Sequence, residues 1–128
     1  MNKLITTIIF LLLSITAFSQ TEAEEEIFTI AEQMPEYKGG LGEMIKFINS
    51  NIQYPKLDAK GLEGTVYVSY IVEKNGKTTG HKIQNSRGWT LETEALRVTQ
   101  LLEFEKPGMQ GDKPVRVQLT QPIKFKLN

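Results

Sequence analysis

The sequence predicts a small α+β domain from three patterns. Residues 64–86 have the composition of two strands joined by a tight turn, residues 41–51 and 90–102 carry apolar residues at helical spacing, and residues 115–127 alternate like a further strand. The chain has 128 residues, no net charge and no cysteine. This composition is typical of one globular domain without disulfides or thiolate chemistry, and the absence of a basic excess argues against a nucleic-acid partner.

The first nineteen residues have the pattern of a secretory signal peptide. Lys3 precedes an uncharged, mostly apolar run from Leu4 to Phe18, and Ala17-Phe18-Ser19 is a small-x-small sequence suited to signal peptidase. An uncleaved membrane anchor is the alternative, although a spanning helix needs about twenty apolar residues. Because an exported protein without cysteine is typical of a bacterial periplasm, we expect this chain there.

Residues 20–33 are expected to form an acidic linker. They contain the tract Thr-Glu-Ala-Glu-Glu-Glu at 21–26 and a brief extended segment around Ile27 and Phe28. The folded domain is then expected to cover residues 34–128.

The first helix is predicted over residues 41–51. One apolar stripe is formed at helical spacing by Leu41, Met44, Ile45, Ile48 and Ile52. Tyr54-Pro55 ends this helix because the residue before a proline avoids the helical region. Pro55 to Lys60 is predicted to form a short second helix with Gly61 as its C-terminal cap.

The hairpin over residues 64–86 is the strongest local pattern. On its first strand Val66, Val68, Tyr70 and Val72 fall on one face, and Tyr67, Ser69 and Ile71 fall on the other. Asn75-Gly76 follows directly and predicts a type I′ turn, because that turn needs two residues with positive φ.

The second half of the chain predicts a helix, a loop and a strand. The helix begins near Thr90 and buries a stripe made of Leu91, Ala95, Val98 and Leu102, with Leu101 on its flank. Gly108 to Pro114 is expected to be a polar loop, and Val115 to Leu127 the last strand. Since Pro122 has no amide to donate to a ladder, this strand is predicted to lie at the edge of the sheet.

The order of these motifs resembles the C-terminal domain of TonB-family energy transducers. The resemblance covers Met34 to Leu127, and it is carried by Met34–Gly40, Tyr54-Pro55, Gly61–Val68, Asn75-Gly76-Lys77, Leu91–Arg97, Lys106-Pro107-Gly108 and Pro122–Phe125. It implies two main helices packed on one face of a three-stranded antiparallel sheet. It also implies structural roles for Tyr54, Pro55, Gly64, Gly76, Pro107, Gly108 and Pro122.

The resemblance further implies a periplasmic domain that binds the TonB box, an extended peptide of outer-membrane receptors, as a strand beside the last strand. Such β-augmentation needs a free edge more than particular side chains. The candidate peptide-binding residues are Arg116, Val117, Gln118, Leu119, Thr120, Gln121, Ile123, Lys124 and Phe125. Side chains of Arg116, Gln118, Thr120 and Lys124 are expected to point away from the core. No cofactor is implied, and a homodimer through a free edge stays open.

Two features of full-length transducers are missing from this sequence. The apolar N-terminal run has no histidine, and no long proline-rich spacer follows it, so coupling to the inner-membrane motor complex is in doubt. A freestanding interaction or self-associating module without force transduction is therefore the alternative. A small periplasmic hydrolase would need paired acid and base groups. Because His81 is the only histidine and has no suggested catalytic or metal-binding partners, we expect neither an enzyme nor a metal site.

Overall fold

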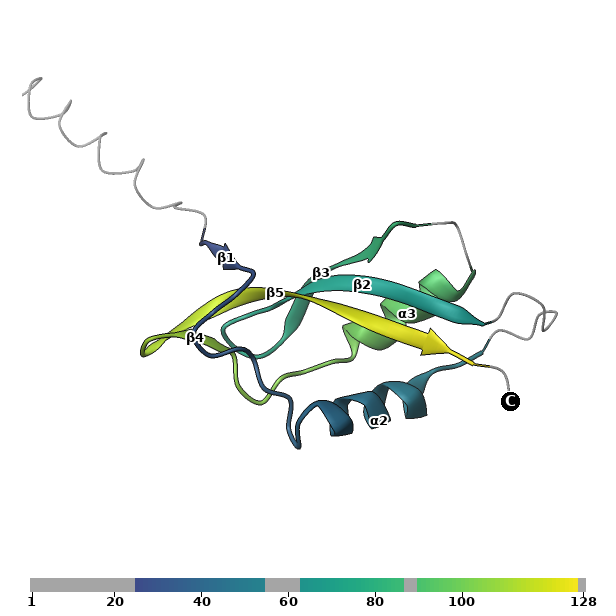
Figure 1. The fold of residues 1–128 in the computed structure, drawn as a ribbon, viewed down its shortest axis with the longest axis horizontal. Helices are drawn as coiled ribbons and strands as arrows, with labels where there is room; N and C mark the ends of the chain where they lie inside the picture. The colour runs from purple at the N-terminus through teal and green to yellow at the C-terminus, as the bar shows by residue number, and fades with distance from the viewer. Residues whose placement is uncertain (1–24, 55–62, 87–89, 127–128) are drawn as a thin grey trace, which may run out of the picture.

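The computed structural model describes residues 25–54, 63–86 and 90–126 (Figure 1). Its elements in chain order are β1 (Ile27–Phe28), α2 (Leu41–Asn51), β2 (Gly64–Val72), β3 (Thr78–Gln84), α3 (Thr90–Gln100), β4 (Gly108–Gln110) and β5 (Lys113–Phe125). The expected signal peptide, the expected short helix at 55–60 and its cap lie outside the described residues.

The sheet is built around one long antiparallel pair. β2 pairs with β5 over nine positions, from Gly64 opposite Phe125 to Val72 opposite Val117. β3 pairs antiparallel with the other side of β2. The α+β class is thus confirmed, whereas the predicted three-stranded antiparallel sheet is incomplete, because the sheet is mixed and has five strands. Two short strands enlarge the sheet to five: β1 runs parallel to β5, and β4 pairs antiparallel with its beginning. Strands of two and three residues are too short to show an alternating pattern in sequence.

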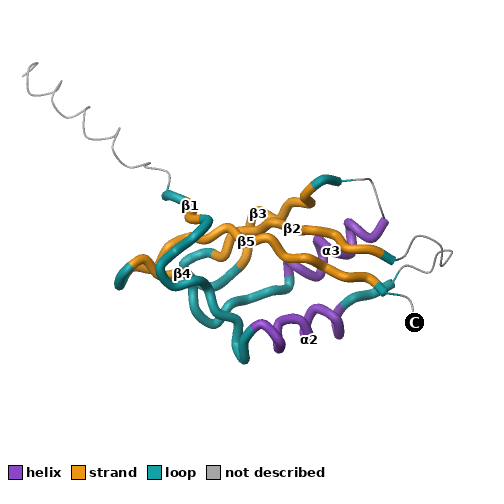
Figure 2. Tube along the Cα trace, viewed as in Figure 1, coloured by secondary structure: helices purple, strands orange, loops and turns teal. Residues whose placement is uncertain are grey.

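Both helices pack against the same face of the sheet, as Figure 2 shows. The predicted inward residues of β2, the predicted stripe of α3 and two residues of α2 form one buried cluster: Val66, Val68, Tyr70, Val72, Leu91, Ala95, Val98, Leu102, Met44 and Ile48. On the opposite face of β2, Tyr67 is 51% exposed. The core therefore lies between the helices and one face of the sheet.

Helix α2 has its predicted bounds, but only part of its apolar stripe is buried. Met44 and Ile48 lie in the core, whereas Leu41 is 63% exposed and Ile45 is 43% exposed. The periodicity predicted the helix correctly and overstated the width of its buried face. These two side chains border a groove described below.

The turn between β2 and β3 differs from the predicted type I′ turn. The N–H of Gly76 donates to the carbonyl of Glu73, and the N–H of Glu73 donates to the carbonyl of Lys77. Gly76 has a φ of +84°, whereas Asn75 is not among the residues with positive φ. The connection is thus a three-residue loop that ends in a left-handed glycine. Asn75 stabilises it differently, because its side-chain oxygen accepts the N–H of Lys77.

The described part of the predicted linker belongs to the fold. Besides the pairing of β1 with β5, Gln33 exchanges backbone hydrogen bonds with Met109, and the side chain of Glu32 accepts the N–H of Gly111. The segment predicted as a polar loop over 108–114 is likewise mostly strand, because β4 and β5 form a tight hairpin there. The acidic composition of residues 22–26 concealed the paired residues that follow.

Candidate functional site

The outer side of β5 is covered at its beginning and open along the rest of its length. β1 pairs with Arg116 and Val117 on the side of β5 that lies away from β2. From Gln118 to Phe125 no strand in the described part of the chain pairs with this side. The prediction of an edge strand therefore holds for residues 118–125 and is wrong for Arg116 and Val117, which pair with β1. Figure 1 shows β1 and β4 gathered at one end of β5.

Pro122 indicates which backbone groups face the open side. It stands opposite Tyr67 in the ladder with β2, and it fits there without loss of a ladder bond only if its nitrogen points away from β2. Alternation along the strand then turns the N–H groups of Thr120 and Lys124 outward as well. The open edge thus presents two amide donors, with the carbonyl of Pro122 between them.

The predicted site residues separate into three groups. Val117, Ile123 and Phe125 are buried, so only their backbone is accessible to a partner. Gln118, Thr120 and Lys124 are exposed, and Thr120 and Lys124 also border the groove described next. Leu119 and Gln121 point toward α2 and border the groove described next. Arg116 is engaged by Glu73, with 2.8 Å from Nε to the nearer carboxylate oxygen, and is no free contact residue.

A groove runs between the open part of β5 and helix α2. It has two hollows that meet at Gln121. The larger, of about 630 Å³, is lined on the helix side by Ile45, Ile48, Asn49, Ile52 and Tyr54. The smaller, of about 350 Å³, is lined by the lead-in segment and the start of α2: Pro35, Glu36, Tyr37, Gly40, Leu41 and Met44, with Phe104 behind them. Sequence analysis missed this wall, although the wide apolar stripe of α2 was a signal for it.

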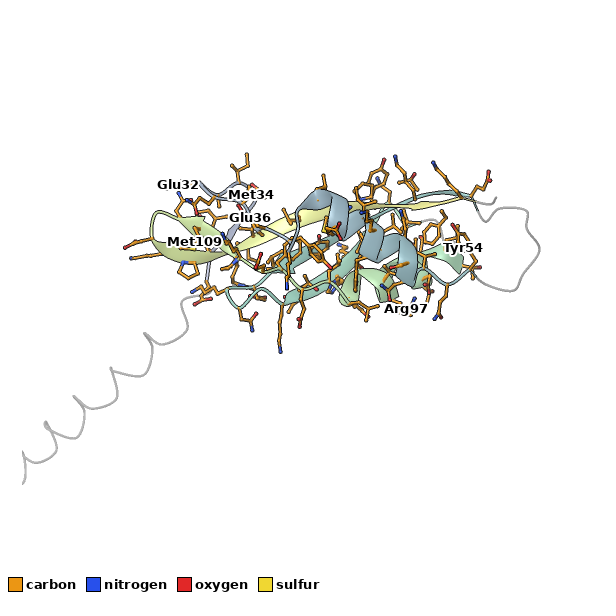
Figure 3. The ribbon with its side chains drawn as sticks, turned by 90° about the horizontal axis from the view of Figure 1, so that it is seen from below. Glu32, Met34, Glu36, Tyr54, Arg97 and Met109 are labelled. Atoms are coloured by element: carbon orange, nitrogen blue, oxygen red, sulfur yellow. The ribbon has the colours of Figure 1, made fainter. Side chains whose placement is uncertain are left out.

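Tyr54 closes the far end of the groove. Its hydroxyl accepts the backbone N–H of Lys126 at 2.8 Å, and its ring packs edge-on against Phe125 with 6.0 Å between centroids. In Figure 3 Tyr54 and Glu36 lie at opposite ends of the domain. Glu36 borders the smaller hollow. The two residues therefore mark the length of the groove.

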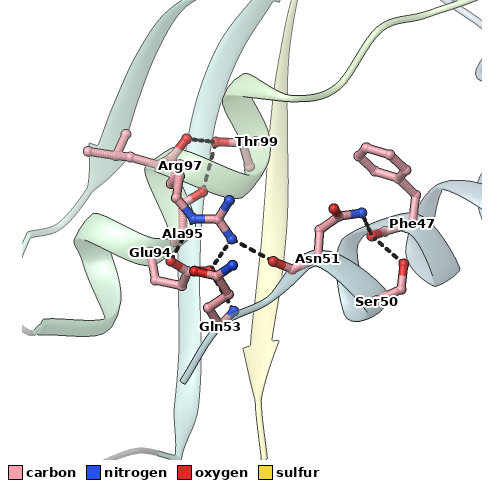
Figure 4. Close-up of polar contacts among 9 residues, drawn as sticks. Phe47, Ser50, Asn51, Gln53, Glu94, Ala95, Arg97 and Thr99 are labelled. Carbon is pink, nitrogen blue, oxygen red and sulfur yellow. Dashed lines mark hydrogen bonds and ion pairs between the residues drawn. The ribbon is translucent and has the colours of Figure 1, made fainter. Parts of the chain in front are cut away.

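An arginine on α3 fixes the segment that carries Tyr54 (Figure 4). Arg97 donates from Nη2 to the carbonyl of Asn51 at 2.5 Å and holds the carboxylate of Glu94 through Nε and Nη2 at 2.9 and 2.6 Å. Glu94 in turn accepts the backbone N–H of Gln53 at 2.7 Å. The hydrogen bonds from Arg97 and Gln53 hold the pKa of Glu94 below its ordinary value, against the opposing effect of partial burial.

A second arginine–glutamate pair lies at the covered end of β5. Arg116 and Glu73 join β5 to the end of β2, and Thr79 also donates to this carboxylate at 2.6 Å. The hydrogen bond from Arg116 is the largest cause that lowers the pKa of Glu73. Because Arg116 also reaches the carbonyl of Glu25, this pair helps to hold β1 in place.

Two of the glycines that carry the resemblance are required by close approach. A Cβ on Gly76 would overlap the carbonyl oxygen of Phe104, whose N–H donates to Gly76 at 2.8 Å. A Cβ on Gly108 would overlap the side chain of Val117, a residue of β5. The two glycines let neighbouring segments pack directly on the sheet that carries the open edge.

His81, the one histidine of the sequence, is held by neighbouring residues of the fold. His81 stacks on Tyr70 at 5.6 Å and contacts Thr78 Oγ1 and the carbonyl of Thr99 at 3.1 and 3.2 Å. Partial burial lowers the pKa of His81, and full burial raises the pKa of Tyr70, because both environments disfavour the charged form. Residues 25–54, 63–86 and 90–126 contain no cluster of three potential metal ligands.

The comparisons identify the family. The model of the Gram-negative bacterial TonB protein C-terminal family matches residues 50–127, which is more than half of the chain. The chain belongs to the TonB C-terminal family. The family is a non-catalytic, transport-associated domain of the bacterial cell envelope, and its members interact with outer-membrane receptors in general. Since the match begins at residue 50, most of α2 lies outside the region that the family model describes.

Among solved structures, a TonB C-terminal domain is similar to this chain. The solution structure of the TonB C-terminal domain of Helicobacter pylori has 25% sequence identity and a TM-score of 0.47, over 67% of this chain and 91% of that one. No curated protein matches the chain. Within the described residues, no helix is long and apolar enough to cross a membrane.

Proposed function

We propose that this TonB-type domain is periplasmic and binds the TonB box of outer-membrane receptors by pairing it with the open side of β5. The single observation that carries the proposal is the unpaired outer side of residues 118–125. An extended peptide placed there gains main-chain hydrogen bonds to Thr120, Pro122 and Lys124. The exposed side chains of Gln118, Thr120 and Lys124 then lie beside those of the peptide.

The bound strand would be confined at both ends. β1 occupies the outer side of β5 at Arg116 and Val117, and Tyr54 takes the N–H of Lys126. Between these two limits lie eight residues of β5, from 118 to 125. This length suits a short linear peptide better than a long added strand, since eight strand residues span about 27 Å.

A nuclear magnetic resonance titration with synthetic TonB-box peptides tests the proposal. We expect amide shifts concentrated at residues 118–125 and along the facing side of α2. A matched peptide with N-methylated backbone amides keeps its side chains and loses main-chain donors, so it should bind more weakly. The proposal is contradicted if no TonB-box peptide from the same cell binds, or if the shifts fall on β3 and the helix-free face alone.

Self-association through the same edge is the competing use of β5, because free edges also pair with copies of themselves. Sedimentation at increasing concentration separates the two. A monomer at all concentrations leaves the edge available to a receptor peptide. Coupling to an inner-membrane motor stays outside the proposal.

A further inference from the structure

The two hollows of the groove lie on the same side of β5, and this arrangement restricts which peptide fits. In an added strand, each residue places its side chain on the same face as the β5 residue directly opposite. Side chains opposite Leu119, Gln121 and Ile123 therefore point toward α2. The smaller hollow includes Leu119 and the larger one extends from Gln121 to Lys126, on either side of Ile123.

The spacing of the hollows matches four residues of an extended chain. Positions opposite Leu119 and Ile123 are four residues apart, or about 13 Å along a strand. On the opposite wall, Leu41 lines the smaller hollow and Ile48 lines the larger one, and the seven residues from one to the other rise about 10 Å along the helix. Figure 1 shows α2 running alongside the open part of β5, so each hollow has a strand wall and a helix wall.

The walls of both hollows expose apolar side chains that the fold itself does not cover. Leu41, Ile45 and Tyr54 are each 40% exposed or more, and they face β5 across the groove. Lys124 and Lys126 are the charged residues that line the larger hollow, whereas Glu36 lines the smaller one. The ends of the groove therefore differ in charge.

We propose that the groove selects extended peptides with apolar side chains at positions i and i+4 and an acidic residue beyond the one that fills the larger hollow. This inference rests on the proposed function and adds a rule for its ligand. The residue midway between the two apolar positions faces Gln121, where the hollows meet. A spacing of three or five residues turns one of the apolar side chains to the helix-free face, where no hollow receives it.

Peptides of equal composition and different spacing test the rule. We would use seven-residue serine/threonine peptides, blocked at both ends, with leucines at positions 2 and 6, 2 and 5, or 2 and 4, and measure dissociation constants by calorimetry. The 2,6 peptide should bind roughly tenfold or more tightly than the 2,5 peptide, because a second leucine leaves water. Equal affinity of the 2,6 and 2,5 peptides would overturn the rule.

Variants of the two walls assign each leucine to its hollow. Leu41→Ser alters the smaller hollow and Ile45→Ser the larger one, and both side chains are already exposed, so the fold should persist. Leu101→Ser is the matched control, since Leu101 is exposed and lines neither hollow. Each groove variant should reduce the preference for the 2,6 peptide at least several-fold, whereas the control should leave it unchanged. A loss that is equal in all three variants would contradict the assignment.

The preference for an acidic residue is tested by a separate set of peptides. We would place glutamate at the first or at the last position of the 2,6 peptide. At low salt, glutamate should strengthen binding at only one of these two ends, and lysine at the same end should weaken binding. Tighter binding of the lysine peptide than of the glutamate peptide would overturn the preference for an acidic residue.

A TonB-box peptide run in parallel keeps the two proposals apart. If it shifts the amides of β5 while the leucine spacing has no effect, the rule fails and the proposed function stands. If the spacing matters while TonB-box peptides do not bind, the groove binds extended peptides and the proposed function fails.

Discussion

The hydroxyl of Tyr54 accepts the backbone N–H of Lys126 across a distance of 2.8 Å, and this bond joins the segment after α2 to the end of β5. It determines where the open side of β5 stops. Tyr54 was expected to be structural from the family resemblance, and the geometry gives the reason for its position. The ring also packs against Phe125. Tyr54 therefore ends the open side of β5 and also lines the larger hollow of the groove.

Tyr54→Phe should release the amide of Lys126 while keeping the ring contact. We expect a loss of about 1 kcal/mol or less in the free energy of unfolding and a faster hydrogen exchange at Lys126. Tyr67→Phe serves as the control, because Tyr67 is exposed on the helix-free face. Unchanged exchange at Lys126 in Tyr54→Phe would show that the hydroxyl does not hold this amide in solution.

Gly76→Ala should destabilise the domain by about 2 kcal/mol or more, because it combines a positive φ with a clash against the carbonyl of Phe104. Urea denaturation measures this loss. Gly111→Ala is the matched control, since Gly111 has a φ of +63° and open space around its Cβ position. It should cost only about 1–2 kcal/mol, the strain alone. Equal losses of unfolding free energy in the two variants would mean that the clash with Phe104 does not contribute to the destabilisation.

Glu94→Gln should remove part of the acid sensitivity of the domain. The pKa of Glu94 is lowered in the folded state, so its stabilising contribution is present above its unfolded pKa and is lost as the pH falls through the folded pKa. Thermal melting between pH 7 and pH 3 should show a smaller decline in the variant. Glu43→Gln is the control, because Glu43 forms an exposed pair with Lys46 that contributes little. The same decline in Glu94→Gln as in the wild type would contradict the role of the Arg97 pair.

His81 should make the domain less stable at mildly acidic pH. Burial is the main cause that lowers the pKa of His81, against the hydrogen bond to Thr99, so the unfolded chain takes up the proton first as the pH falls below about 6.5. The stability contributed by the neutral imidazole is therefore present above that pH, and it is lost as the pH falls toward the pKa of His81 in the folded protein. His81→Leu should remove this dependence between pH 7.5 and pH 5, since it is the only histidine. A wild-type melting temperature that is flat in this range would contradict the account.

The long elements were predictable from sequence because their patterns are strong and local. The alternation of Val66 to Val72 and the helical spacing of Leu91 to Leu102 correspond to the buried faces found in the structure. The short strands β1 and β4 were not predictable, since their pairing depends on residues about ninety positions away or on a hairpin turn rather than on their own composition.

The site was only partly predictable for a similar reason. Pro122 indicated an open edge correctly, but no local pattern shows that β1 covers Arg116 and Val117. The helical spacing groups Leu41 and Ile45 with the core residues of α2 in one apolar stripe, and only the tertiary arrangement shows that these two line a groove. Sequence periodicity distinguishes apolar from polar faces, whereas it does not distinguish a core from a binding surface.

Thr120→Pro should block the edge without altering the side of β5 that pairs with β2. The variant removes one outward N–H, as Pro122 already does two residues further on, so the ladder with β2 should persist. We expect at least a tenfold weaker affinity for a TonB-box peptide, because the variant loses a main-chain donor and adds a ring at the edge. Thr120→Val, which keeps the amide, should bind nearly as the wild type does. Equal affinity of the two variants would contradict main-chain pairing at this position.

Hydrogen exchange of the β5 amides, measured with and without a saturating TonB-box peptide, tests the open edge most directly. The N–H groups of Thr120 and Lys124 should exchange readily in the free protein and become at least tenfold slower in the complex. Those of Ile123 and Phe125, which face β2, should be slow in both states. If Thr120 and Lys124 are already protected in the free protein, or stay unprotected in the complex, β5 is not the strand that receives the peptide.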